Sequence, residues 1–188
     1  KSFIVSNDKF TNSKNIDGKF IGLLDLGITF SHEKYDEKGL KSYIRRGLKS
    51  FLEFPFISAI YFYVYDENEY DFKYSGGTPD NTPNDDLLKE LTDAGTVSQA
   101  LQTAEISFHK SKQITRGVLP LKNINGINSF LILKMNQEPE SIRISELKLL
   151  VNFGQLFSSG LSEFLLKEEI KHTKDVLDQV VASRTIEL

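Results

Sequence analysis

Helical spacing of apolar residues predicts two helices in the first third of this 188-residue chain. The first begins at Asn15 and carries Ile16, Phe20, Leu23 and Leu24 on one face. The second precedes Pro55, because the residue before a proline is disfavoured in a helix. Its apolar stripe, interrupted by Lys and Arg, consists of Leu40, Tyr43, Ile44, Leu48, Phe51 and Leu52.

Residues 57–65 form the clearest strand pattern, because β-branched and aromatic residues dominate them. A turn separates them from residues 70–77, which predicts a hairpin. Both alternating faces of the first strand are apolar, so we expect cover on both sides. The face with Ile60 and Phe62 should meet the terminal helices. The tyrosine face should be the better candidate for a pocket, because buried hydroxyls need partners; it carries Ala59, Tyr61, Tyr63 and Tyr65.

The second half of the chain continues with shorter patterns before one long helix. We expect two short helices over 85–91 and 96–101, a strand over 105–109, and a hairpin formed by 115–122 and 127–135. Pro120 predicts an edge or bulged position in its strand, since proline cannot donate to the ladder. From Ser145 the apolar residues keep helical steps: Leu147, Leu150, Phe153, Phe157, Leu161 and Phe164.

This order of elements predicts an α+β fold in which helices flank an antiparallel sheet on both faces. The helix at each end of the chain should pack on the face opposite the tyrosines. There the apolar residues of 16–24 should contact Leu150, Phe153 and Phe157.

The apolar stripe of the last helix narrows after residue 165. Its apolar residues are Leu166, Ile170, Leu177 and Val180, with Thr173 at the skipped seam position and Arg184 at the next. A narrow seam of this kind is typical of a two-stranded coiled coil. We therefore expect residues 165–188 to project and to pair in parallel with the same segment of a second chain. The alternative is a helix that folds back onto its own domain.

The composition and motifs of the chain exclude several classes of partner and reaction. The formal charge of −3 and the lack of a concentrated basic face argue against nucleic acid as a partner. With no cysteine, disulfides, thiol nucleophiles and thiolate metal sites are excluded. The sequence has no unbroken apolar run of membrane-spanning length, so we expect no membrane contact. No histidine has a second metal-like ligand at the usual spacing, and no nucleophile or phosphate-loop motif occurs. We predict neither a metal site nor a catalytic residue, although the acidic hairpin tip, residues 66–71, leaves a weak metal site open.

Three segments together resemble the GAF family of sensory domains. They are "AGTVSQALQTAEISFHK", the hairpin "TRGVLPLKNINGINSFLILKM" and the helix "SELKLLVNFGQLFSSGLSEF". The resemblance covers residues 15–165. The ending "VASRTIEL" resembles the Arg-Thr-x-Glu-Leu end of helical connectors in bacterial signalling proteins. Together the two resemblances imply a lead-in over residues 1–14, a sensory domain over 15–164, and a connector over 165–188 that leads to a further output module.

The resemblance to the GAF family also limits which cofactors and ligands are expected. GAF-like methionine sulfoxide reductases work through cysteines, and many bilin-binding members attach the pigment to one, so neither chemistry is expected here. The Asn-Lys…Phe…Asp-Glu motif of cyclic-nucleotide-binding members has no convincing counterpart. His172 lacks the acidic-apolar-basic-x-Pro run that follows the phosphoacceptor of histidine kinases. The ligand therefore stays unidentified.

The resemblance implies a non-catalytic, cytoplasmic sensory domain of a signal-transduction protein such as a sensor histidine kinase of a two-component system or a diguanylate cyclase. It would act as a homodimer. The alternative is a ligand-free dimerisation or scaffold module. Any small ligand should lie against the tyrosine face, unless the aromatic residues there simply fill a closed core. The candidate ligand-binding residues are Tyr61, Tyr63, Tyr74, Phe108, His109, Arg116 and Ser129.

Overall fold

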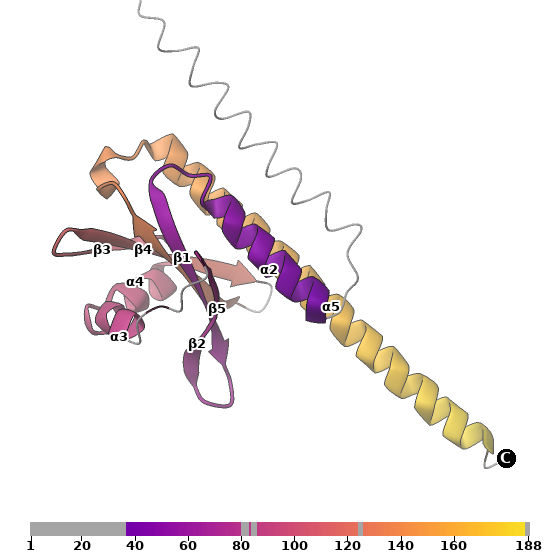
Figure 1. The fold of residues 1–188 in the computed structure, drawn as a ribbon. Helices are drawn as coiled ribbons and strands as arrows, with labels where there is room; N and C mark the ends of the chain where they lie inside the picture. The colour runs from indigo at the N-terminus through magenta and orange to yellow at the C-terminus, as the bar shows by residue number, and fades with distance from the viewer. Residues whose placement is uncertain (1–36, 80–82, 84–85, 124–125, 187–188) are drawn as a thin grey trace, which may run out of the picture. The chain divides into compact units, whose positions relative to one another are not determined.

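A five-stranded antiparallel sheet lies at the centre of the structure (Figure 1). The computed structural model describes residues 37–79, 83, 86–123 and 126–186, all of which belong to one compact unit. The strand order is β2-β1-β5-β4-β3. The helix predicted from Asn15 lies outside the described residues, so its packing against the last helix stays a prediction.

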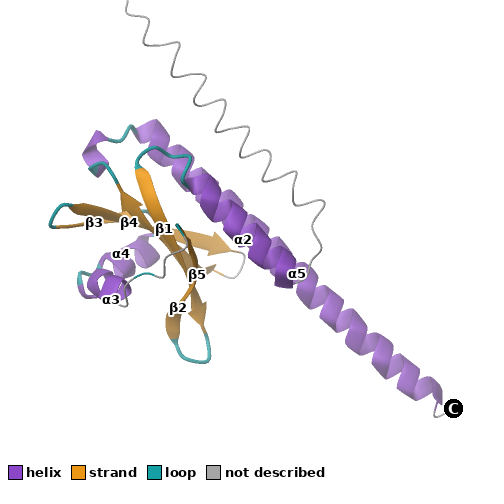
Figure 2. Cartoon of the chain, in the orientation of Figure 1, coloured by secondary structure: helices purple, strands orange, loops and turns teal. Residues whose placement is uncertain are grey.

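The described elements follow the predicted order along the chain (Figure 2). Their bounds are α2 Glu37–Phe51, β1 Ile57–Asp66, β2 Asp71–Thr78, α3 Asp86–Asp93, α4 Thr96–Thr103, β3 Ser107–Ser111, β4 Ile114–Asn123, β5 Gly126–Met135, η2 Pro139–Ser141 and α5 Ile144–Ile186. Helices α2 and α5 cover one face of the sheet, and α3 and α4 cover the other. This arrangement confirms the predicted α+β fold.

Aromatic side chains fix α2 against α5. The Phe51 ring meets Phe153 edge-on at a centroid distance of 4.4 Å, and Tyr43 stacks on Phe157 at 5.4 Å. The buried Tyr43 hydroxyl donates a hydrogen bond to the Phe157 carbonyl at 2.8 Å. Burial raises the pKa of Tyr43 far above its usual range. Gly47 allows this close approach, because a Cβ there would lie 2.3 Å from the Phe157 ring.

The apolar face of β1 packs against these two helices, of which the prediction named only the last, α5. Ile60 and Phe62 are fully buried, and the Phe62 ring meets Phe157 edge-on at 5.9 Å. Gly154 brings α5 equally close to β4, since a Cβ there would lie 2.9 Å from the Leu119 side chain. The terminal helix is thus an integral part of the core.

Pro120 lies in β4, the second-last strand of the sheet, where it pairs with Phe130 of β5 but has no partner on the β3 side. Strand β3 pairs only with residues 114–118 of β4, so Pro120 lies past the end of that ladder. A register shift between Leu121 and Lys122 follows directly. This placement agrees with the expected edge or bulge, because the missing N–H interrupts no hydrogen bond to β3.

Helix α5 runs without a break for 43 residues. It contains an 18-residue window with a mean hydropathy of 1.2, which suits a membrane-spanning helix by length and composition. However, 39% of that window is buried inside the domain. The side chains of Phe153, Phe157 and Phe164 supply much of its apolar character and are part of the core. Packing within the domain therefore accounts for part of this apolar window.

Candidate functional site

A cleft of about 180 Å³ opens between α3 and the tyrosine face of the sheet. Strands β1, β4 and β5 form its floor and α3 forms one wall, and the lining is half polar in character. It is lined by Tyr61, Asp86, Leu87, Glu90, Ile114, Arg116, Ile132 and Lys134. The cleft therefore combines an aromatic surface with charges of both signs, the mixture that orients a small ligand.

Glu90 is the centre of the charged groups in this cleft. Its Oε1 atom lies 2.9 Å from Nη1 of Arg116 and 3.7 Å from Nε2 of His109. A hydrogen bond from Ser111 has the largest effect on the pKa of the Glu90 carboxyl and lowers it. Desolvation opposes this effect, and Arg116 lowers the pKa further. The Arg116 side chain is only 16% exposed, so this partner is needed to keep its charge compensated.

Local sequence patterns position these groups. Helix α3 is amphipathic: Leu87 and Leu91 are buried against the sheet, which leaves Glu90 at the rim. His109 and Arg116 are direct partners in the β3–β4 ladder and therefore share a face. The ladder thus presents two nitrogen-bearing side chains to one carboxylate.

The structure brings five of the seven predicted ligand residues to this face. Tyr61 and Arg116 line the cleft. His109 lies next to the cleft, because it contacts Glu90, which also lines it. Tyr63 is only 4% exposed and stacks on Phe130 at 5.4 Å, while Tyr74 packs against Tyr63. This half of the tyrosine face is a closed core, so the open part lies around Tyr61.

The other two predicted residues lie on the opposite face. Phe108 pairs with Gly117 and covers it from the α5 side of the sheet, and Ser129 pairs with Val64 beneath α2 and α5. The prediction that these two share a face with Tyr61 is wrong. Alternation along a strand decides the face, and a register error of one residue reverses it.

Several cleft residues escaped the sequence reasoning. A partly buried arginine requires an acidic partner, so the placement of Arg116 on the tyrosine face was a usable signal for Glu90. The spacing of Leu87, Glu90 and Leu91 on α3 gave a second signal, since it places the carboxylate next to the buried stripe. Nothing in the sequence indicated the remaining lining residues, Asp86, Ile114, Ile132 and Lys134.

Lys73 forms ion pairs with two of the four carboxylates at the acidic hairpin tip. Nζ of Lys73 lies 2.8 Å from Asp66 and 2.5 Å from Glu69, and the hydrogen bond from Lys73 lowers the pKa of Asp66. Within the part of the chain that the structure describes, no group of three or more possible ligands could hold a metal ion. The tip is thus best explained as a surface salt-bridge network.

The second half of α5 presents a separate apolar strip. From Leu165 onward the described side chains are largely exposed, including Ile170 at 66% and Leu177 at 57%. The predicted seam residues Leu166 and Val180 are exposed as well. Figure 1 shows this half of the helix running beyond the sheet and α2. Most apolar side chains of this half are therefore largely exposed in the described part of the chain.

Comparison of the coordinates with solved structures identifies the fold. The GAF domain of a protein assigned as a sensor histidine kinase, from Pseudomonas syringae pv. tomato, is 12% identical with a TM-score of 0.56, covering 88% of this chain and 99% of that one. The GAF domain of an Acinetobacter phosphoenolpyruvate-protein phosphotransferase is 12% identical with a TM-score of 0.55, covering 77% and 93%. The chain has a GAF-like fold.

A third solved structure with this GAF-like fold is a PelD fragment from Pseudomonas aeruginosa PA14 in complex with c-di-GMP. It is 15% identical with a TM-score of 0.54, and the match covers 78% of this chain and 50% of that one. No protein-family model matches the sequence. A search of curated proteins likewise finds no match. At these identities the comparisons establish the fold, while the site must be argued from its own residues.

Proposed function

We propose that this chain is a non-catalytic, cytoplasmic sensory or regulatory domain that transmits a signal through a dimer of α5. The observation that carries the proposal is the continuity of this helix. Its first half is buried in the core beside the sheet, and its second half leaves the domain with an exposed apolar strip. A change in the domain can therefore move the projecting half without an intervening loop.

The projecting half needs a partner to be stable. A single helix of about this length is marginal in water, because most helical stability comes from packing of an apolar face. Leu166, Ile170, Thr173, Leu177 and Val180 are spaced by alternating steps of four and three. These are the core positions of a heptad repeat, so a second copy of the same helix would bury the strip.

Flanking residues favour a parallel pair in register. In such a pair each g position lies beside the following e position of the partner helix. With Ile170 and Leu177 at a positions, Glu169 would face Lys174 of the second copy, which gives opposite charges. Val176 would face Val181, and both are exposed apolar residues. Both flanking pairs thus match this geometry.

Sedimentation equilibrium of the 188-residue chain tests the dimer. Leu177→Asp places a charge on the seam and should convert dimer to monomer, since a buried unpaired carboxylate is strongly unfavourable. Gln179→Asp adds the same charge two residues away, off the seam, and should leave the dimer intact. A wild-type chain that remains monomeric at high concentration would exclude this part of the proposal.

The proposed input is a small molecule in the cleft beside Tyr61. The mixed aromatic and charged lining of the cleft supports this input. Native mass spectrometry of the purified chain should show a bound small molecule. Arg116→Gln should reduce its occupancy, because Arg116 supplies a cation to the cleft. Arg143→Gln, an exposed arginine outside the cleft, is the matched control.

A ligand-free scaffold is the rival function, and the packing of Tyr63 favours it. Among the described residues on this face of the sheet, the closed aromatic core around Tyr63, Phe130 and Phe72 leaves a small cleft beside Tyr61 for a ligand. A purified dimer with no bound molecule would favour the scaffold.

A further inference from the structure

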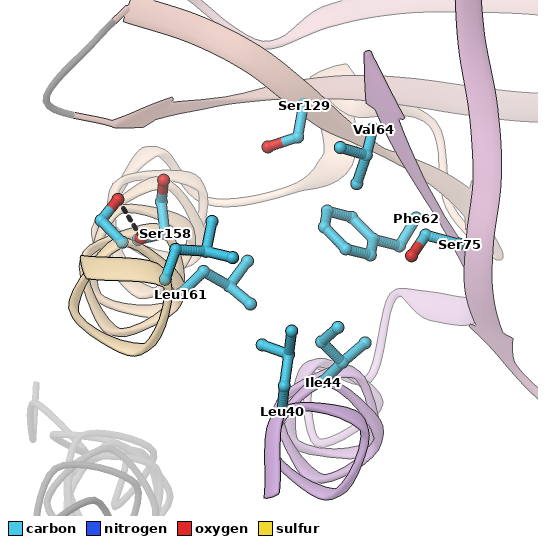
Figure 3. Close-up of a pocket in the computed structure, with 10 residues that line it drawn as sticks. Leu40, Ile44, Phe62, Val64, Ser75, Ser129, Ser158 and Leu161 are labelled. Atoms are coloured by element: carbon cyan, nitrogen blue, oxygen red, sulfur yellow. Dashed lines mark hydrogen bonds between the residues drawn. The ribbon is translucent and has the colours of Figure 1, made fainter. Parts of the chain in front are cut away.

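A second cleft lies on the other face of the sheet, between β1, α2 and α5 (Figure 3). Its volume is about 230 Å³. Leu40 and Ile44 reach it from α2 and Leu161 from α5, while Phe62 forms part of the floor. The other lining residues are Val64, Ser75, Ser129, Ser158, Ser162 and Leu165. None of the ten lining residues is charged, so the cleft offers an apolar surface interrupted only by serine hydroxyls.

One of these hydroxyls has an unmet hydrogen-bonding requirement. Ser158 donates to the Lys122 carbonyl at 2.9 Å, and Ser162 donates to the Ser158 carbonyl at 3.0 Å. Ser129 is 6% exposed, and among the described residues no group hydrogen-bonds to its hydroxyl. Figure 3 shows this hydroxyl directed into the cleft. A buried polar group without a partner is costly, so the site is suited to a molecule that supplies one.

We infer that this cleft binds a small, neutral, largely apolar ring compound that carries one hydrogen-bonding group directed at Ser129. The lack of charged lining residues excludes a specific anion or cation. An engineered apolar cavity of about 150 Å³ accepts benzene, so the larger cleft here suits a bicyclic ring. Leu161 and Leu165 lie where α5 leaves the domain, so an occupant would touch the root of the projecting helix. The site is separate from the cleft beside Tyr61.

Indole is a suitable probe, since it is bicyclic and has a single N–H that Ser129 can accept. The chain contains no tryptophan, so indole fluorescence can be followed against a tyrosine background only. Indene has nearly the same shape without the N–H and can be measured by competition. The full chain should bind both compounds, and indole more tightly. Ser129→Ala should weaken indole about 3–10-fold and leave indene nearly unchanged, the range expected for one neutral hydrogen bond.

A matched pair of variants on α5 locates the binding. Ser162 lines the cleft and Ser159 does not, yet each hydroxyl donates to the carbonyl four residues earlier. Ser162→Leu should fill the cleft and abolish binding of both compounds, whereas Ser159→Leu should bind like the wild type. The inference is overturned if the full chain does not bind indole, which would mean that water or another part of the chain occupies the space. It is equally overturned if Ser129→Ala weakens both compounds alike, or if Ser162→Leu still binds.

Discussion

The two halves of α5 belong to one uninterrupted helix and follow different rules. In the first half, Phe153, Phe157 and Phe164 are buried, and the helix is held by α2 and the sheet. In the second half, residues of similar apolarity such as Ile170 and Leu177 are exposed. The contrast shows that an apolar helix face indicates where the helix needs a packing partner. In one half the partner is the domain, and in the other we propose a second chain.

The largest expected effect is on the buried half. Phe157→Ala removes a ring that contacts Tyr43, Phe51 and Phe62, and it should destabilise the domain by about 3–5 kcal/mol. Leu177→Ala on the projecting half should change the free energy of unfolding by no more than about 0.5 kcal/mol. Urea unfolding at concentrations that keep the chain monomeric measures both. Equal losses would mean that the projecting half packs on its own domain.

A smaller loss is expected where α2 approaches α5. Alanine favours a helix over glycine by about 1 kcal/mol, yet a Cβ at Gly47 would lie 2.3 Å from the Phe157 ring. Overpacking of this kind typically costs about 1–3 kcal/mol, so Gly47→Ala should be net destabilising. Ser50→Ala, later in the same helix and half-buried, serves as a control. A Gly47→Ala chain more stable than the wild type would contradict this tight contact.

The projecting half should be open to improvement, unlike the buried half. Thr173 occupies a seam position with a polar side chain whose hydroxyl donates to the Glu169 carbonyl. Thr173→Leu should tighten the dimer roughly tenfold or more, because it adds apolar area to both helices. Gln179→Leu, off the seam, should have little effect. Dissociation constants from sedimentation distinguish the two, and an unchanged constant for Thr173→Leu would contradict the assigned seam.

The smallest effect concerns the charged cleft and pH. The pKa of Glu90 is lowered in the folded chain, first by the hydrogen bond from Ser111 and then by Arg116. Its contribution to stability is therefore present above the unfolded pKa and is lost as pH falls through the folded pKa. Glu90→Gln should destabilise the chain slightly at neutral pH and should flatten the loss of stability on acidification. Glu105→Gln, at an exposed position, should do neither. Identical acid profiles for wild type and Glu90→Gln would contradict the pairing with Arg116.

Local patterns were sufficient to predict most of the described fold. The stripe of α2, the two hairpins and the long last helix all follow from periodicity and turn residues. Short-range details were less secure. The N-cap of α4 was not predicted: Gly95, with φ of 74°, occupies it, and no side chain forms a cap hydrogen bond there. The left-handed conformation at the junction favours glycine there.

The candidate site was harder to predict because it depends on faces and on distant partners. Tyr61 and Arg116 could be placed together from strand alternation. Alternation also shows that the adjacent residues Phe108 and His109 cannot share a face. The face of Ser129 depends on the pairing of β5, which a sequence does not give. Glu90 joins the site through packing of α3 on the sheet, a contact between separate elements.

Disulfide cross-linking tests the parallel α5 dimer most directly. The chain has no cysteine, so single variants such as Ile170→Cys and Leu177→Cys have no background. In a parallel pair in register both positions lie opposite themselves, close enough for a disulfide. An antiparallel pair can place at most one of them so. We predict efficient oxidation of both variants to covalent dimers, with little for Gln179→Cys. Cross-linking of only one seam variant, or equal cross-linking at Gln179, would contradict the parallel dimer.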